Sequence, residues 1–166
     1  GVPAIPLPFC KDLHFDRAGY DEVLAEVIEQ YQPDLIVCAG WMRILSPPFV
    51  RRFAGKIINL HPALPGMFPG TRSIEAAYQA FRRGEIQRTG VMVHYVDEGV
   101  DTGPVIATRE VPIYSTDTLK DLEERIHAAE HELLTAAIRA VIEKRSQGES
   151  GESPATRNPD QREGEE

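Results

Sequence analysis

Apolar and polar residues follow two different periods along this chain. In some stretches the apolar residues recur every three or four positions, which is typical of a helix with one buried face. The clearest example is the set Tyr20, Val23, Leu24, Val27 and Ile28. Runs rich in Val and Ile without this spacing indicate strands instead. We predict helices at 16–31, 46–53, 73–83 and 117–144, and strands at 2–8, 34–40, 56–60, 89–96 and 105–112.

The order of these elements predicts the fold class. The apolar run 34–40 is unbroken, as in a parallel strand that is buried on both faces. Strands and helices alternate in the first half, whereas 89–96 and 105–112 indicate an antiparallel pair joined by a polar turn. We therefore predict an α/β fold with an open, mostly parallel twisted sheet, helices on both faces and an antiparallel extension near the C-terminus. Ligands bind beyond the carboxyl ends of such strands, which places 40–45 and 59–70 on the binding rim.

The chain divides into one predicted domain and a polar tail. Residues 1–146 suffice for a single core. Residues 147–166 contain six acidic residues, two basic residues and almost no apolar ones, so we predict that this tail is disordered. Because the chain opens with Gly1 inside an apolar, Pro-rich run, we expect the domain to be incomplete at its N-terminus.

Composition and charge narrow the class of ligand. The net charge of -8 argues against nucleic acid as the main partner. No run approaches the ~18 apolar residues of a membrane span and no signal peptide is visible, so we predict a cytoplasmic protein without membrane contact. Cys10 and Cys38 lie in apolar runs, which is typical of buried thiols in a reducing compartment. The absence of a glycine-rich dinucleotide motif and of a phosphate-loop lysine weakens the interpretation as a nucleotide-binding protein.

Three polar residues suggest a reaction centre. Asn59 and His61 stand two apart after an apolar run, so on a strand both side chains point to one side. Asp101 lies in a Gly-bounded turn from which its carboxylate can reach the imidazole. An amide that holds an oxyanion, an imidazolium that donates a proton and a carboxylate suffice for acyl transfer to an amine without a metal. The carboxylate is expected to raise the pKa of His61.

Other interpretations of these residues stay open at this point. An isolated Asn-x-His is usually a turn or a satisfied polar pair, and a turn like that of Asp101 is most often only a turn. His94 is about as suited to a structural role on its strand as to an active site. His127 and His131 have a spacing that suits a metal, but no metalloprotease motif surrounds them. Arg43 can bind an anion or cap a strand end.

These residues belong to a longer series of segments, namely Pro33–Leu45, Ile58–Pro62, Phe68–Gly70, Thr89–Val91, Val93–Glu98, Val100–Pro104 and Glu130–His131. Taken in order, they resemble the phosphoribosylglycinamide formyltransferases, a folate-dependent family of purine synthesis. Each segment is a weak signal alone, but the ordered series is highly specific. The resemblance runs from about Gly1 to Ile142, which is nearly everything except the tail.

The resemblance implies a Rossmann-like catalytic domain that transfers a formyl group from 10-formyltetrahydrofolate to the amine of glycinamide ribonucleotide, without a metal, as a monomer or homodimer. It implies Asn59, His61 and Asp101 as the catalytic set, with His61 as proton donor. The residues that it implies for folate binding are Arg17, Met42, Arg43, Ile44, Leu45, Asn59, Asp97, Glu98, Gly99, Val100 and Asp101. Those that it implies for ribonucleotide binding are His127, Ala128, Ala129 and Glu130.

The sequence departs from the family pattern in three places. The residues at 62–66, after the histidine, differ from the usual sequence of the family at this place. The stretch 70–90 is a few residues longer than in common members of the family. The family also begins with a strand, a Gly-Ser-Asn phosphate loop and a helix that this sequence lacks. Because such a loop normally holds the substrate phosphate, we expect a fragment that binds the ribonucleotide poorly. Full steady-state turnover by this chain would contradict that expectation.

Enzymes with related functions share the same fold and the same three catalytic residues. Formyltetrahydrofolate deformylase passes the formyl group to water, and formyltransferases acting on methionyl-tRNA or amino sugars usually carry a further downstream domain. The acidic tail and the lack of a basic surface favour a small-molecule acceptor. A non-catalytic folate-binding fragment is the remaining alternative, and the intact Asn59, His61 and Asp101 argue against it.

Overall fold

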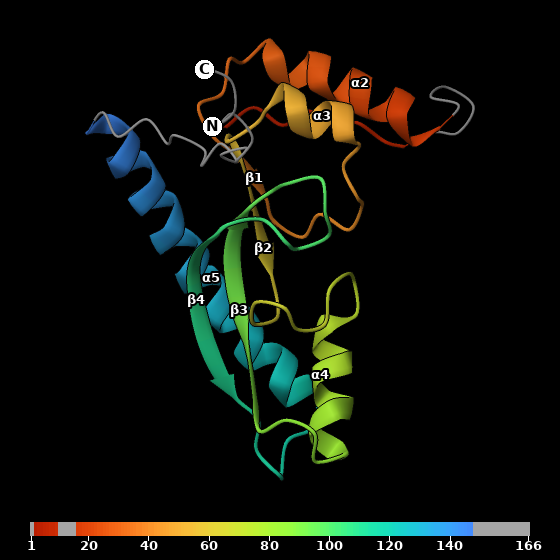
Figure 1. Cartoon of the computed structure of the whole chain (residues 1–166), viewed down its shortest axis with the longest axis vertical. Helices are drawn as coiled ribbons and strands as arrows, with labels where there is room; N and C mark the ends of the chain where they lie inside the picture. Colours follow the sequence, from red (N-terminus) through yellow and green to blue (C-terminus); the bar gives the residue numbers. More distant parts are fainter. Residues whose placement is uncertain (1, 10–15, 148–166) are drawn as a thin grey trace, which may run out of the picture.

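The structure is a computed structural model that describes residues 2–9 and 16–147, so Cys10 and the predicted tail beyond Gln147 lie outside it. Its elements, labelled in Figure 1, are α2 (Arg17–Glu29), β1 (Ile36–Cys38), α3 (Pro47–Arg52), β2 (Ile57–His61), α4 (Ser73–Arg82), β3 (Arg88–Tyr95), β4 (Val105–Pro112) and α5 (Leu119–Ser146). Within the described ranges, no helix combines the length and the apolar composition that a membrane span requires.

The described strands form one sheet in the order β1-β2-β3-β4. β1 pairs with β2 in parallel, whereas the β2–β3 and β3–β4 pairs are antiparallel. The antiparallel extension is thus confirmed, but the mostly parallel sheet is confirmed only for the first pair. The sequence pattern does not distinguish these cases, because apolar runs of the same length mark strands of either direction.

Two hydrophobic clusters cover opposite faces of this sheet. Ile57 and Ile58 are neighbours on β2, and because strand side chains alternate, each enters a different cluster. Ile58 packs with residues of β3, β4 and α5, while Ile57 packs with residues of α2, α3 and β1. Figure 1 shows the same division, with α2 and α3 together at one end and α5 running along β3 and β4. The predicted helices on both faces are therefore confirmed.

The first two predicted strands differ from the structure. Residues 2–9 form no helix or strand, and prolines at positions 3, 6 and 8 explain this because proline cannot donate to a strand ladder. β1 spans three residues, not the predicted seven, and Val37 within it is 36% exposed. Because Val37 is exposed, the prediction of a strand buried on both faces is wrong. Among the described strands β1 has only β2 as a neighbour.

Short-range signals define the helix ends well. The Asp16 side chain accepts a hydrogen bond from the Gly19 amide at 2.8 Å and caps α2. Thr118 and Asp121 form a reciprocal capping box at the start of α5. Both helices start within two residues of their predicted positions because these contacts depend on residues only three apart.

An ion pair joins the start of α5 to the chain before it. Asp117 accepts hydrogen bonds from the Tyr114 amide at 2.7 Å and from both terminal nitrogens of Arg125, at 2.8 and 2.9 Å. These bonds, chiefly those from Arg125, lower the pKa of Asp117 to about 2. The carboxylate therefore favours the folded state in its charged form.

We expect Asp117→Asn to lower the free energy of unfolding at pH 7 by about 1 to 2 kcal/mol, because a charge-assisted network is lost. A depressed pKa gives stability that is present above the ordinary value near 3.8 and is lost as the pH falls toward about 2. The difference between the two proteins should accordingly vanish across that interval in urea titrations. Glu124→Gln, at an exposed pair with Lys120 on the same helix, is the control. A difference that persists at pH 2 would contradict the prediction.

Candidate active site

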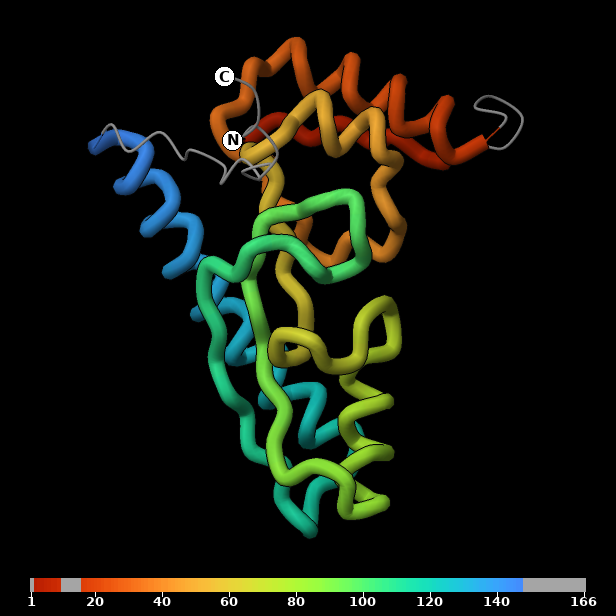
Figure 2. The backbone as a smooth tube through the Cα atoms, viewed as in Figure 1, coloured from red at the N-terminus to blue at the C-terminus, as the bar shows by residue number. Residues whose placement is uncertain are grey.

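A cavity of about 450 Å³ lies where loops leave the ends of β1, β2 and β3. Its walls come from the loop 40–45, the end of β2 at 59–62, the segment 70–75 and the turn that follows β3. One face of α5 closes a further side with Glu123, His127 and Glu130. Figure 2 shows these loops gathered between the α2–α3 pair and α4. Both segments that the sequence placed on a binding rim contribute to this cavity.

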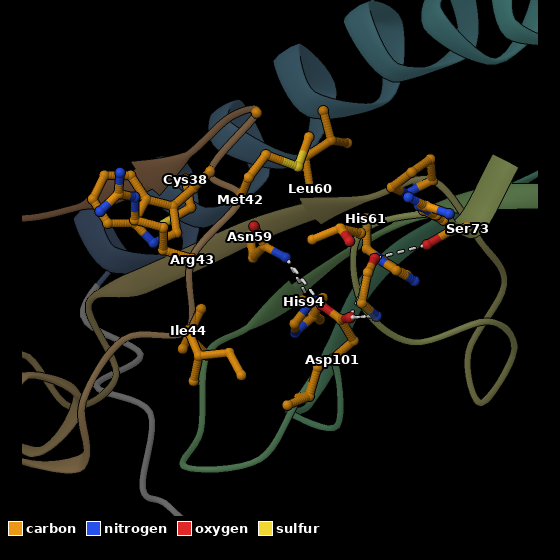
Figure 3. Close-up of a pocket in the computed structure, with 18 of the residues that line it drawn as sticks. Cys38, Met42, Arg43, Ile44, Asn59, Leu60, His61, Ser73, His94 and Asp101 are labelled. Carbon is orange, nitrogen blue, oxygen red and sulfur yellow. Dashed lines mark hydrogen bonds and ion pairs between the residues drawn. The ribbon is translucent and has the colours of Figure 1, made fainter. Parts of the chain in front are cut away.

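The three residues proposed for the chemistry meet in this cavity (Figure 3). Asn59 and His61 lie on the same side of β2, and Asp101 reaches them from the turn after β3. Oδ1 of Asp101 is 3.3 Å from Nδ2 of Asn59, and Oδ2 is 3.4 Å from Nδ1 of His61. One carboxylate therefore contacts both the amide and the imidazole.

The backbone holds Asp101 in an unusual conformation. Its φ is +54°, in the left-handed region that non-glycine residues rarely occupy. The Gly70 amide donates a hydrogen bond to Oδ2 of Asp101 at 2.9 Å and so ties the Pro-rich loop to the carboxylate. At Gly103 an added Cβ would lie 1.8 Å from the carbonyl oxygen of Tyr95, so only glycine lets the turn approach β3 this closely.

Burial lowers the pKa of His61 below its ordinary value of 6.5, and this effect exceeds the raising effect of the Asp101 carboxylate. The backbone of Met67 and Phe68 also raises the pKa, and the neighbouring His94 lowers it. The His61 side chain is only 4% exposed, so a positively charged ring would have lost most of its hydration. The attraction to one carboxylate at 3.4 Å does not compensate for this loss. The predicted rise in the pKa of His61 is therefore wrong, and the ring is neutral at neutral pH.

The tautomer of neutral His61 follows from its neighbours. Nδ1 faces Asp101, which can only accept a hydrogen bond, so the proton is assigned to Nδ1. Nε2 is buried and has no hydrogen-bond partner within the described part of the chain. The lone pair on Nε2 is thus the basic group that this ring offers.

His94 joins the site, a role that the sequence left undecided. It is directly opposite Asn59 in the β2–β3 register and is 2% exposed. Its Nδ1 lies 2.8 Å from the Tyr95 carbonyl oxygen and donates to it, so in the neutral ring Nε2 accepts from Nδ2 of Asn59 at 3.3 Å. The same Nε2 lies 3.5 Å from Oδ1 of Asp101. The orientation of the Asn59 amide is fixed by these contacts, because its oxygen would repel Asp101. Strand alternation alone gave no signal for this, since it requires the register.

The residues implied for folate binding fall into two groups. Those that line the cavity are Met42, Arg43, Ile44, Leu45, Asn59, Asp97, Gly99, Val100 and Asp101. Arg17 and Glu98 are not among the lining residues. Arg17 donates from Nε to the Ile44 carbonyl oxygen at 3.1 Å, behind the cavity loop, and Glu98 pairs with Arg51 at 2.8 Å on the surface.

The residues implied for ribonucleotide binding also separate. His127 and Glu130 are three apart on α5 and line the cavity, as does Glu123 one turn further back. Ala129 faces the hydrophobic cluster and Ala128 is exposed, so neither lines it. Burial raises the pKa of Glu130. Helical periodicity could have identified Glu123, which the sequence analysis missed.

Two further features bear on cofactor chemistry. Cys38 lines the cavity, and burial raises the pKa of its thiol to about 11, so it is protonated at neutral pH. Among residues 2–9 and 16–147, no group of three or more His, Cys, Asp or Glu side chains is arranged to hold a metal ion.

Comparison with known proteins supplies an independent line of evidence. The formyl transferase family model matches residues 3–138. The chain is 51% identical over 142 residues to a phosphoribosylglycinamide formyltransferase of Schizosaccharomyces pombe, covering 82% of this chain and 68% of that one. The crystal structure of a phosphoribosylglycinamide formyltransferase from Bacillus halodurans superposes with a TM-score of 0.74 at 38% identity, covering 81% and 68% of the two chains.

A solved formyltetrahydrofolate deformylase from Pseudomonas syringae has a similar TM-score of 0.76, but the identity is 27%. That match covers 87% of this chain and 46% of the deformylase. The chain spans about two thirds of the length of the two formyltransferases above. The fold is therefore shared by both kinds of protein, and the sequence is nearer to the transferases.

Proposed function

We propose, from the premise that this chain belongs to the formyl transferase family, that it transfers a formyl group to the amine of glycinamide ribonucleotide in purine biosynthesis. The proposed donor is 10-formyltetrahydrofolate. The observation that carries the proposal is the convergence of Asn59, His61 and Asp101 in one cavity. The sequence of the chain, nearer to transferases than to a deformylase, supports the choice of an amine over water as the acceptor.

The donor and the acceptor would occupy different parts of the cavity. We propose that the folate lies between the loop 40–45 and the turn at 97–101, with its formyl group toward Asn59. The ribonucleotide would lie toward α5, where the Glu130 carboxylate can accept hydrogen bonds from both ribose hydroxyls. Both ligands are small molecules. We also propose that the protein acts in the cytoplasm.

The reaction begins with attack of the amine nitrogen on the formyl carbon. The nitrogen lone pair forms the new C–N bond, and the electrons of the carbonyl π bond move to oxygen. Asn59 donates from Nδ2 to this oxyanion, which replaces His94 as the acceptor of that hydrogen. The contact between Asn59 and Asp101 keeps the amide nitrogen turned toward the reacting carbon.

His61 moves one proton from the amine to the folate. Because Nε2 is buried in the ligand-free structure, this step requires the surroundings of the ring to open when the substrates bind. Nε2 of the neutral ring then accepts a proton from the nitrogen that became positive on attack. The Asp101 carboxylate, 3.4 Å from Nδ1, stabilises the imidazolium so formed. The same proton is then donated to N10 of the folate as the old C–N bond breaks and the carbonyl re-forms. The products are the formylated amine and tetrahydrofolate, with His61 neutral again.

The test measures loss of the formyl group from 10-formyltetrahydrofolate with and without glycinamide ribonucleotide. We expect loss only when the ribonucleotide is present, with one formylated amine formed for each tetrahydrofolate. The acceptor is titrated to high concentration, so that weak acceptor binding does not hide the reaction. Loss of the formyl group at the same rate without acceptor would mean that the chain is a hydrolase and not a transferase. Binding of the folate without loss of the formyl group would mean that the chain is a non-catalytic binding module.

A further inference from the structure

A buried charge that the proposed chemistry does not use lies in α2. The side chain of Asp21 is only 1% exposed, yet Asp21 does not line the cavity. Its ion-pair partner Arg17 is one helical turn earlier, with 2.8 Å between Nη2 of Arg17 and Oδ1 of Asp21. Within the described part of the chain, Oδ1 of Asp21 and both Nη atoms of Arg17 have no hydrogen-bond partner, so these atoms contribute an ion pair only. The hydrogen bonds of the pair are made by the other atoms, Oδ2 of Asp21 and Nε of Arg17.

Both members of the pair hold the same loop. Oδ2 of Asp21 accepts a hydrogen bond from the Ser46 amide at 2.6 Å, and Nε of Arg17 donates to the Ile44 carbonyl oxygen at 3.1 Å. We propose that Arg17 and Asp21 form a clamp, here called the α2 clamp, that positions the loop 40–46 for binding of the folate donor. This inference rests on the proposed function for the identity of that ligand.

The loop packs on the hydrophobic cluster through Leu45 and Trp41 but has no regular backbone structure. Residues 40–45 form no helix or strand, and within the described part of the chain no backbone–backbone hydrogen bond involves them. Met42 and Ile44 are 67% and 66% exposed, whereas Leu45 is buried beneath them. Gly40 begins the loop at φ +65°, a left-handed conformation that glycine adopts without strain. The α2 clamp supplies polar contacts at two backbone positions near the far end.

Aromatic rings and a second cation complete the surroundings of the α2 clamp. The Arg17 guanidinium lies 5.4 Å from the ring centre of Trp41 and 5.1 Å from that of Tyr20. Arg43 lies over Phe9 at 4.5 Å. Burial is the main reason that the pKa of Arg17 lies below its ordinary value, and the charge of Arg43 lowers it further. The charge of Asp21 favours the charged form of Arg17 while that of Arg43 opposes it, so removal of Asp21 would leave the repulsion between the two arginines uncompensated. Arg43 lines the cavity, so this repulsion would be transmitted to the donor site.

Trp41 is the one tryptophan of the chain, so its fluorescence reports on this loop alone. We expect Asp21→Asn and Arg17→Lys each to increase quenching of Trp41 by acrylamide in the ligand-free protein. Asn keeps the shape of Asp21 without its charge, and Lys keeps the charge of Arg17 without its planar fork. Glu22→Gln is the matched control, since Glu22 is adjacent on α2 but pairs with Arg52 outside the loop. Far-UV circular dichroism verifies that α2 persists.

The second measurement is binding of tetrahydrofolate, the product of the donor, by calorimetry. We expect Asp21→Asn to weaken it roughly tenfold, the equivalent of one charge-assisted hydrogen bond. In turnover the same variant should raise KM for the donor while leaving kcat within a factor of about three, because the clamp acts on position and not on chemistry. Asp21→Asn also leaves Arg17 in place, which separates the clamp from a direct contact between Arg17 and the folate.

Trp41 quenching that stays unchanged in both variants would overturn the proposal. So would a loosened loop with unchanged affinity for tetrahydrofolate, because the clamp would then not serve the ligand. If the unmodified chain fails to bind tetrahydrofolate at all, the proposed function fails instead, and the clamp is judged on the quenching alone.

Discussion

His61→Ala is expected to lower the rate of formyl transfer by a factor of about 10² to 10⁴, the usual contribution of a positioned acid–base group. The alanine variant has no group that can take the proton from the attacking amine or return it to N10. The measurement is a single turnover with the protein in excess over the formyl donor, so that weak acceptor binding does not mask the chemical step. Affinity for tetrahydrofolate should change far less than the rate.

His131→Ala is the control for this variant, because His131 is an exposed histidine on α5 that does not line the cavity. A His61→Ala rate within a factor of about three of the unmodified chain would mean that the imidazole is not the proton carrier. Equal losses of rate and affinity would mean that the cavity binds its ligand through His61 without using it for chemistry.

The pH dependence of the rate provides a second test of His61. Burial lowers the pKa of this ring below 6.5, so the neutral form that accepts the proton dominates at neutral pH. The rate constant kcat/KM should therefore fall as the pH decreases through that lowered pKa, with a slope of one on a logarithmic plot. The acidic limb should disappear in His61→Ala. An unchanged limb would assign it to another group.

Asp101→Asn is expected to have the second largest effect, a loss of about 10²-fold or more in the single-turnover rate. The substitution keeps the size of the side chain but removes the charge that stabilises the imidazolium at 3.4 Å. It also turns an acceptor of three contacts, from Asn59, His61 and Gly70, into a group that presents N–H bonds to some of them. The substitution therefore removes the negative charge of Asp101 and, at the same time, the contact that orients the Asn59 amide.

The pKa of His61 separates these two contributions. Removing the carboxylate removes a raising influence, so nuclear magnetic resonance titration of His61 should give a still lower pKa in Asp101→Asn. Glu110→Gln, at an exposed pair with Arg88 on β4, controls for the loss of one negative charge from the protein. A raised pKa for His61 in the variant, or an unchanged rate, would contradict the assigned role of Asp101.

Much of the local structure could be predicted because it depends on neighbours in sequence. The caps at Asp16 and Thr118 join residues three apart, and the helices they begin were correctly predicted. Asn59 and His61 share a side of β2 because strand residues alternate. The resemblance to a formyl transferase also depends on the linear order of segments, and the family comparison agrees with it.

Contacts between distant segments decided the rest. Asp101 is 42 residues from Asn59 in the chain, and only the turn after β3 brings its carboxylate within 3.3 Å of that amide. The position of His94 opposite Asn59 required the β2–β3 register, and the direction of β3 required the packing of the whole sheet. Neither leaves a trace in local periodicity.

The sequence by itself therefore determined which residues are candidates for acyl-transfer chemistry and on which helices and strands they lie. The tertiary structure decided the protonation state of His61 and the attachment of the loop 40–46 to Arg17 and Asp21. The physical reason is the same for both. Loss of water around a charge and hydrogen bonds across 25 or more residues depend on how the chain packs, and neither is encoded in the spacing of neighbouring residues.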